Sequence, residues 1–296
     1  MTDEAHWDIR ALQARIADGP QRIRYPAGSP DNLETEKYIE YLGRHLHNAG
    51  KNPADADVVV LGMTPEIRLA LHEFGYGVTC VDNSDQAIEL FRDWIPPAYR
   101  QRETIKRSDW TAYASTAGKS IDAFLGDGVL ANFPDVGSCR DLLCALFQAL
   151  TPGGVCIFRL TSLPSRYIEL PSLSHEYIRQ FRNNDLDPYE FGFAIRKFGF
   201  LDRAYDAKNF ILNNQLVFEL LREMHMNSKL SEEEYAATQR YQFYGPNLLM
   251  PRDKLKTLIA ECGFQVETHR LNGRHWYDYY SFYVCSKRSP ACTVDR

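Results

Sequence analysis

The first residues suited to chemistry follow a short apolar run at 57–61, within the sequence LGMTPE. Gly62 permits close backbone approach, the Thr64 hydroxyl can cap a following helix, and Glu66 falls in that helix's first turn. Backbone N–H groups at the start of a helix favour a carboxylate or phosphate. The turn therefore predicts a nucleotide-binding position, and its alternative is an ordinary capped turn that binds nothing.

A carboxylate follows the second apolar run, GVTCVD, where Asp82 stands twenty residues beyond Gly62. At this separation an acid after the second strand can hold both ribose hydroxyls of a nucleoside. The alternative is an N-cap for the next helix, but Ser84 already suits that task. The pattern favours Asp82 as a ribose-binding residue.

Two further strand ends carry polar residues. In SDW, Asp109 can accept a hydrogen bond from the adenine amino group while Trp110 covers the ring. The alternative is that Asp109 is an ordinary acidic residue in a surface turn. In IDAFLGDG, two glycines flank Asp127 and would direct its carboxylate into a cleft, although D-G is also a plain turn dipeptide. Asn132 lies just beyond, near the expected reacting group. Together the four strand ends offer what an adenosine-containing ligand needs.

The elements that must position these residues alternate between strand and helix. Such alternation predicts right-handed crossovers and a doubly wound α/β sheet, with ligands at the carboxyl ends of its strands. The predicted strands are 57–61, 77–82, 104–110, 121–128 and 151–160, and the helices between them are 65–75, 84–94 and 138–150.

The remaining chain divides around this core. We expect N-terminal lid helices over 1–50, the α/β core over 51–160, an inserted helical cap rich in Tyr and Phe over 161–245, and the end of the core over 246–290. The last part contains a helix at 251–264 and two strands, 265–271 and 278–288, expected to pair antiparallel.

These segments resemble the class I S-adenosylmethionine-dependent methyltransferases over roughly 33–160 and 245–288. VVVLGMTPE stands at the glycine-rich first motif, VTCVD at the second, SDW at the third and IDAFLGDG at the fourth. TPGG and ECGF before the closing hairpin are also typical. The resemblance implies a seven-stranded Rossmann-like sheet with an antiparallel last strand, which NAD-binding Rossmann enzymes lack.

The first motif departs from the family pattern. Val60 replaces the usual acid, and Thr64 and Glu66 replace the second and third glycines, as in a divergent branch with LGxTPE. The resemblance implies S-adenosyl-L-methionine as cofactor, with Glu66 facing the ammonium of its methionine moiety. The complete implied pocket is Gly62, Thr64, Glu66, Asp82, Asp109, Trp110 and Asp127.

Methyl transfer needs alignment in a water-poor pocket, aromatic faces near the sulfonium, and a base only where the acceptor loses a proton. The candidate catalytic residues are Asn132, Tyr177, Tyr244 and His175, each with core packing or surface exposure as the alternative. Two other functions stay open. One is a cyclase or lyase resembling the azetidine-carboxylate synthases, which releases methylthioadenosine, and the other is non-catalytic binding of the cofactor.

Composition limits the partners. The 296 residues carry a net charge of −5, which disfavours a nucleic-acid-binding surface. They are 44% apolar and 25% charged, which is typical of an ordinary soluble globular protein. Seven scattered cysteines indicate neither a disulfide framework nor a metal site. We found neither a membrane-length apolar run nor a leader, which predicts a cytoplasmic enzyme with a small-molecule acceptor. The acceptor and the oligomeric state are not predicted.

Overall fold

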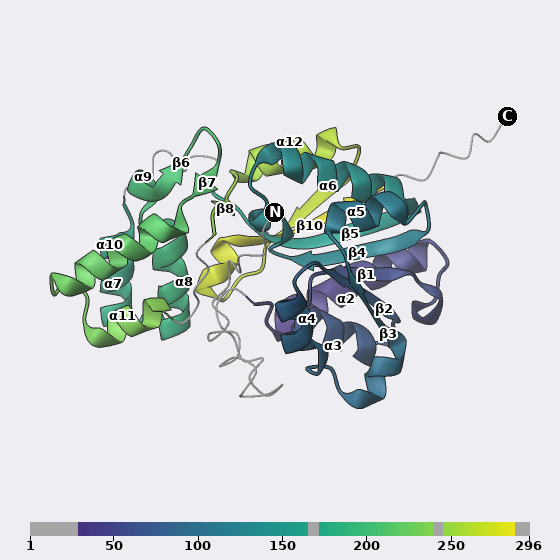
Figure 1. Ribbon diagram of the computed structural model, residues 1–296, viewed down its shortest axis with the longest axis horizontal. Helices are drawn as coiled ribbons and strands as arrows, with labels where there is room; N and C mark the ends of the chain where they lie inside the picture. Colours follow the sequence, from purple (N-terminus) through teal and green to yellow (C-terminus); the bar gives the residue numbers. More distant parts are fainter. Residues whose placement is uncertain (1–28, 165–171, 240–244, 288–296) are drawn as a thin grey trace.

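The computed structural model in Figure 1 describes residues 29–164, 172–239 and 245–287. Its main sheet has seven strands in the order β3-β2-β1-β4-β5-β10-β9. Neighbours from β3 to β5 pair in parallel, and β10 runs antiparallel to both β5 and β9. This confirms the predicted doubly wound sheet with one reversed strand. The bounds are β1 Val58–Leu61, β2 Val78–Asp82, β3 Glu103–Arg107, β4 Ile121–Asp127, β5 Leu150–Thr161, β9 Gln265–His269 and β10 Tyr280–Ser286.

Helices cover both faces of this sheet, which explains the unbroken apolar strands. Val58 and Val60 pack into one apolar cluster, whereas Val59 and Leu61 pack into the other. A strand that alternates between two buried faces needs apolar residues at every position. The first face is covered by α2 Asn32–Asn48, α3 Pro65–Glu73 and α4 Asp85–Arg92, and the second by α5 Trp110–Thr116, α6 Val136–Ala149 and α12 Arg252–Glu261.

The prediction of a strand over 104–110 was wrong at its end, because β3 stops at Arg107 and Trp110 begins α5. The Asp109 carboxylate accepts hydrogen bonds from the backbone nitrogens of Thr111 and Ala112, at 2.9 and 3.0 Å. Such an N-cap satisfies amides that have no partner within the helix and so starts the helix here.

The elements between β5 and α12 lie beside the main sheet, on the left in Figure 1, and we call them the cap. They continue beyond the predicted end of the cap at 245, because β8 pairs with β7. Its own core contains Phe191, Phe193 and Phe198. A three-stranded sheet, β6-β7-β8, was not predicted, because two-residue strands are too short to show an alternating pattern. The cap elements are α7 Ser174–Arg182, α8 Pro188–Phe198, α9 Leu201–Ala204, β6 Tyr205–Asp206, β7 Ile211–Leu212, α10 Asn214–Met226, α11 Glu232–Gln239 and β8 Asn247–Leu248.

Short 3-10 helices complete the described chain: η2 Pro53–Asp55, η3 Pro97–Arg102, η4 Val129–Asn132 and η6 His275–Asp278. In the ranges that the structure describes, no helix has the length and apolarity needed to cross a membrane. The cysteines in those ranges are free thiols, and all but Cys144 are buried.

Candidate functional site

The carboxyl ends of β1 and β2 and the start of α5 meet at Gly62. A Cβ atom at Gly62 would lie 3.8 Å from both the Asp82 Oδ2 atom and the Trp110 Cζ2 atom. The Trp110 indole is held in place by its Nε1 atom, which donates to the Val81 carbonyl oxygen at 2.7 Å. The structure therefore brings together three residues that the sequence placed at three separate strand ends.

Gly62 is required at this position by its backbone. Its φ of +100° lies in a region that side-chain-bearing residues rarely adopt, and its nitrogen donates to the Val81 carbonyl oxygen at 2.8 Å. The absence of a side chain also leaves the space beside Asp82 and Trp110 open. A side chain at this position would lie against the Asp82 carboxylate and the Trp110 ring.

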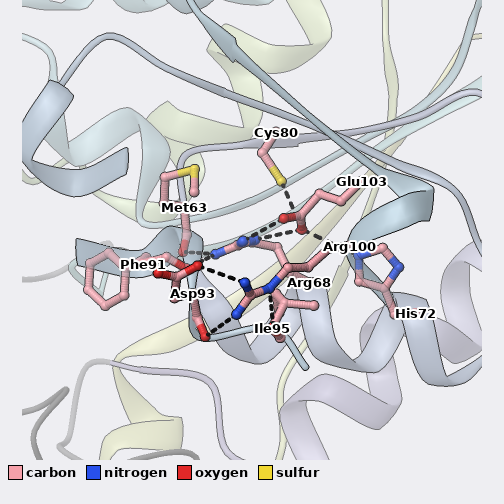
Figure 2. Close-up of polar contacts among 9 residues, drawn as sticks. All are labelled: Met63, Arg68, His72, Cys80, Phe91, Asp93, Ile95, Arg100 and Glu103. Carbon is pink, nitrogen blue, oxygen red and sulfur yellow. Dashed lines mark hydrogen bonds and ion pairs between the residues drawn. The ribbon is translucent and has the colours of Figure 1, made fainter. Parts of the chain in front are cut away.

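The buried Arg68 side chain holds the turn that follows β1, as Figure 2 shows. The Arg68 Nη1 atom donates to the carbonyl oxygens of Met63 at 3.4 Å and Phe91 at 2.8 Å. Its Nε and Nη2 atoms donate to the two Glu103 oxygens at 2.9 and 2.7 Å. Arg68 therefore ties the turn after β1 to the end of α4 and the start of β3.

The charge of Glu103 is matched within the same cluster. Burial alone would raise the pKa of Glu103, but hydrogen bonds from His72 and Arg68, together with the Arg68 charge, lower it to about 2. Both oxygens of Glu103 are engaged by the Arg68 fork, and Oε1 also lies 3.3 Å from His72 Nε2. The pair stays ionised at neutral pH and gives the turn after β1 a rigid support.

Asp82 lies in a different environment. Burial raises its pKa from 3.8 to about 6, against the lowering effect of hydrogen bonds from the backbone of Ser84 and Asn83. The Oδ1 atom accepts from the Ser84 nitrogen at 2.9 Å, while Ser84 itself caps α4 through its hydroxyl. The prediction that Ser84 caps this helix is confirmed, whereas the ribose-binding role of Asp82 stays a prediction; its second carboxylate oxygen is directed towards Gly62.

The two other residues predicted from the first motif, Thr64 and Glu66, lie at the start of α3. Thr64 occupies the N-cap position of α3 and Pro65 the first helical position, but no backbone nitrogen of the helix donates the expected capping hydrogen bond to the Thr64 hydroxyl. The backbone of Thr64, at φ −55° and ψ 107°, departs from the extended conformation that turns a capping side chain towards the helix. Glu66 is buried in the first turn of α3.

The structure pairs Asp127 with a buried arginine. Asp127 Oδ1 accepts from Arg159 Nε at 2.7 Å and Oδ2 from Nη2 at 3.1 Å. Arg159 Nη1 donates to both oxygens of Glu34, on α2, at 2.8 and 2.9 Å, and the Tyr280 ring lies 4.0 Å from the guanidinium. The Asp127 side chain is 11% exposed, so it lies at the margin of this cluster. Its cofactor role stays a prediction.

The turn after β4 connects the core with the cap. Asn132 is exposed, and its amide donates to the Gly128 carbonyl oxygen at 3.3 Å. The adjacent Ala131 carbonyl oxygen accepts from the Asn247 amide of β8 at 3.3 Å. Phe133 lies against Trp110, with 6.2 Å between ring centroids. This turn therefore borders the Gly62–Asp82–Trp110 position on one side and the cap on the other.

The predicted cap residues are not brought to that position by any described contact. Tyr177 is buried in the cap core, and its hydroxyl lies 2.5 Å from that of Tyr279. His175 is exposed and lines a cavity of about 520 Å³ formed by α7, the end of α10 and the following turn. Tyr244 lies outside the described residues. Much of the cap's aromatic content thus forms its own core.

Sequence reasoning missed Glu34, Arg68 and Arg159, all of which are buried. The available signal was an arginine inside the apolar strand VCIFRL, because a charge on a buried face needs a partner. The partner could not be identified, since Glu34 lies 125 residues away in the chain. Within the described ranges, no cluster of three or more His, Cys, Asp or Glu side chains is placed to hold a metal ion.

No known family model matches the chain, and no curated protein matches it. Among solved structures it is similar to the CcbJ methyltransferase from Streptomyces caelestis, with 13% identity, a TM-score of 0.55, and 96% of this chain and 100% of that chain covered. It is also similar to a SAM-dependent methyltransferase from Methanosarcina mazei, with 16% identity, a TM-score of 0.50, and 83% and 97% covered. The chain has the class I methyltransferase fold.

A third similar structure carries a different name. It is a Rhodobacter sphaeroides protein provisionally assigned to the Zn-dependent alcohol dehydrogenases, with 16% identity, a TM-score of 0.55, and 94% of this chain and 98% of that chain covered. At identities this low, structural similarity shows a shared fold alone, and it does not transfer a reaction or a ligand.

Proposed function

We propose that the protein is an S-adenosylmethionine-dependent methyltransferase that acts on a small-molecule acceptor. The observation that carries this proposal is the convergence of Gly62, Asp82 and Trp110 at the carboxyl ends of the first strands, where this fold binds ligands. Two of the three similar structures described above are named as methyltransferases, which supports the same choice.

The residues present fit the cofactor. The open space at Gly62, which a Cβ atom would partly fill, admits a ligand next to the Asp82 carboxylate. That carboxylate would accept hydrogen bonds from two neighbouring ribose hydroxyls, and the Trp110 ring offers an apolar face to the adenine. Glu66 would face the ammonium of the methionine moiety, at the start of α3. Thr64, Asp109 and Asp127 complete the proposed pocket.

When bound, S-adenosyl-L-methionine supplies an electrophilic methyl group on a positively charged sulfur. The chain's own contribution is to orient cofactor and acceptor and to exclude water from the space between them. The turn that contains Asn132 borders both the cofactor position and the cap, so an acceptor held there would meet the methyl group. A basic side chain is needed only where the acceptor loses a proton.

A small acceptor is favoured by the cap and by the charge. The cap's small sheet contacts the turn after β4 through Asn247, and a cap at this place would limit the size of an acceptor. The net charge of −5 gives no support for a nucleic-acid substrate. A cytoplasmic location is part of the same proposal.

The test measures binding and product separately. We expect calorimetry to detect binding of S-adenosylmethionine and S-adenosylhomocysteine to the purified protein. We then expect S-adenosylhomocysteine to form only when a panel of small amines, phenols and carboxylic acids is added as acceptors. Methylthioadenosine formed without any acceptor would replace the proposal with a cyclase or lyase. Binding without turnover across the panel would favour a non-catalytic binding protein, and absence of binding would reject the cofactor.

A further inference from the structure

Two cysteines that lie far apart in the sequence come together where α6 packs against the end of α12. Cys144 lies on α6, and Cys262 directly follows the last residue of α12. The Cys262 thiol donates to the Arg140 carbonyl oxygen, with 3.8 Å between sulfur and oxygen. Within an α-helix a carbonyl oxygen points at the residue four positions later, so this contact places the Cys262 sulfur beside Cys144.

The neighbouring contacts between α6 and the end of α12 fix the same alignment. The Arg140 guanidinium lies 2.7 Å from the Glu261 carboxylate. Seven positions further along α6, the Phe147 ring lies against Gly263, where a Cβ atom would come within 2.9 Å of its Cζ atom. Residues four and seven positions after Arg140 share its face of the helix. The two cysteines therefore occupy the middle of a row of facing residues that runs along both elements.

The two thiols differ in their access to solvent. Among the cysteines in residues 29–164, 172–239 and 245–287, Cys144 is the exposed one, whereas Cys262 is 8% exposed. Burial and, next in size, a hydrogen bond with the Cys144 thiol raise the pKa of Cys262 to about 12. Cys262 is therefore protonated at neutral pH. Because access and thiolate character set the rate of thiol oxidation, an oxidant in solution should react first with Cys144.

A second pair of cysteines gives an internal comparison. Cys156 on β5 and Cys285 on β10 stand directly opposite each other in the sheet. Both side chains are fully buried, and burial raises the pKa of both thiols. This pair matches the first in proximity but has no thiol that an oxidant in solution can reach.

We propose that Cys144 and Cys262 form a disulfide when the protein meets hydrogen peroxide. The Cys144 sulfur attacks one peroxide oxygen and the O–O bond breaks, which leaves Cys144 as a sulfenic acid and releases one water. The Cys262 sulfur then attacks the sulfenic sulfur, so that an S–S bond forms and the S–O bond breaks. The departing oxygen leaves as a second water that carries the Cys262 proton. The two thiols lose two electrons in total, and the peroxide is reduced to water.

The disulfide would protect Cys144 from permanent damage. A sulfenic acid with no thiol beside it is oxidised further to a sulfinic acid, which common reductants do not reverse, whereas a disulfide returns to two thiols. In a reducing compartment such a bridge forms only while the oxidant is present. This inference goes beyond the proposed function and does not depend on it, because it involves neither the cofactor nor an acceptor.

The experiment treats the purified full-length protein with hydrogen peroxide, blocks the remaining thiols with N-ethylmaleimide in denaturant, and maps the cysteines by mass spectrometry. Digestion with trypsin and chymotrypsin separates Cys144 from Cys156, because Phe147 lies between them. We expect a linked pair of peptides that contains Cys144 and Cys262, is two hydrogen atoms lighter than the reduced peptides, and disappears with dithiothreitol. Cys156 and Cys285 should be recovered as blocked thiols. Oxidised Cys144 alongside unlinked Cys262 would overturn the proposal.

Two variants test the protective role of the pair. In Cys262→Ser, the same dose of peroxide should leave about tenfold more sulfinic acid at Cys144 than in the wild type. Cys292→Ser, which changes a cysteine outside the described residues, should form the same bridge as the wild type. Equal sulfinic acid in Cys262→Ser and the wild type would overturn the proposal, as would a wild-type bridge from Cys144 to Cys292. The wild-type map needs no substitution and decides the proposal even if Cys262→Ser fails to fold.

Discussion

Replacing Asp82 by Asn should weaken binding of the ligand and stabilise the ligand-free protein. Asn keeps one side-chain oxygen that can accept a hydrogen bond from the Ser84 nitrogen, which lies 2.9 Å from Asp82 Oδ1 in the wild type. The substitution removes the negative charge. The carboxylate is proposed to accept two ribose hydroxyls. Losing these charge-assisted bonds should cost about 3 kcal/mol, which corresponds to about a hundredfold rise in the Kd for S-adenosylhomocysteine.

The ligand-free protein should become more stable. The pKa of Asp82 rises from 3.8 to about 6 on folding because the ionised form is desolvated. At about 1.4 kcal/mol per pH unit, this rise corresponds to at most about 3 kcal/mol, and about half of that remains once partial solvent access is included. The folded state binds the proton more tightly, so wild-type stability falls as pH rises from about 4 to 6.

The assay is urea denaturation of the ligand-free protein at pH 4.5 and pH 8, alongside calorimetry with S-adenosylhomocysteine. The gain in unfolding free energy for Asp82→Asn should be larger at pH 8, where the wild-type carboxylate is fully ionised. Asp85→Asn is the matched control, because this exposed residue at the start of α4 lies three positions after Asp82 and pairs with Arg107 at 2.8 Å. It should change stability by less than about 1 kcal/mol and leave affinity intact. Loss of stability with unchanged affinity in Asp82→Asn would refute the reasoning and assign Asp82 a structural role.

Two further variants test other parts of the site. Glu66→Gln should weaken binding of S-adenosylmethionine by calorimetry, because the carboxylate is proposed to face the cofactor ammonium; an unchanged Kd would remove Glu66 from the pocket. Arg159→Met should lower the unfolding free energy by about 3–5 kcal/mol in urea denaturation, since it leaves Glu34 and Asp127 buried without their cation. Arg140→Met, which breaks the exposed pair with Glu261, should change the unfolding free energy far less, and a similar loss in both variants would contradict the argument.

Local pattern was enough to derive the sheet and the centre of the candidate site. The apolar runs before Gly62 and Asp82 could only be strands buried on both faces, and alternation with helices required parallel pairing. Parallel strands bring their carboxyl ends to one edge, so Gly62 and Asp82 were expected at the same edge, and the strand order of the structure makes them neighbours there. Ser84 as a helix cap followed from residue type alone.

The partners of the buried charges were decided only in three dimensions. Arg159 meets Glu34 across 125 residues of chain, and Lys197 meets Asn247 across 50. No periodic pattern links residues so far apart, because helix and strand periods describe only neighbours within one element. Asp109 and Asp127 looked alike as acids after strands, but Asp109 caps a helix through nitrogens two and three residues further on, which is a local contact. Only the tertiary structure made Asp127 the partner of a buried arginine, 32 residues away in the chain.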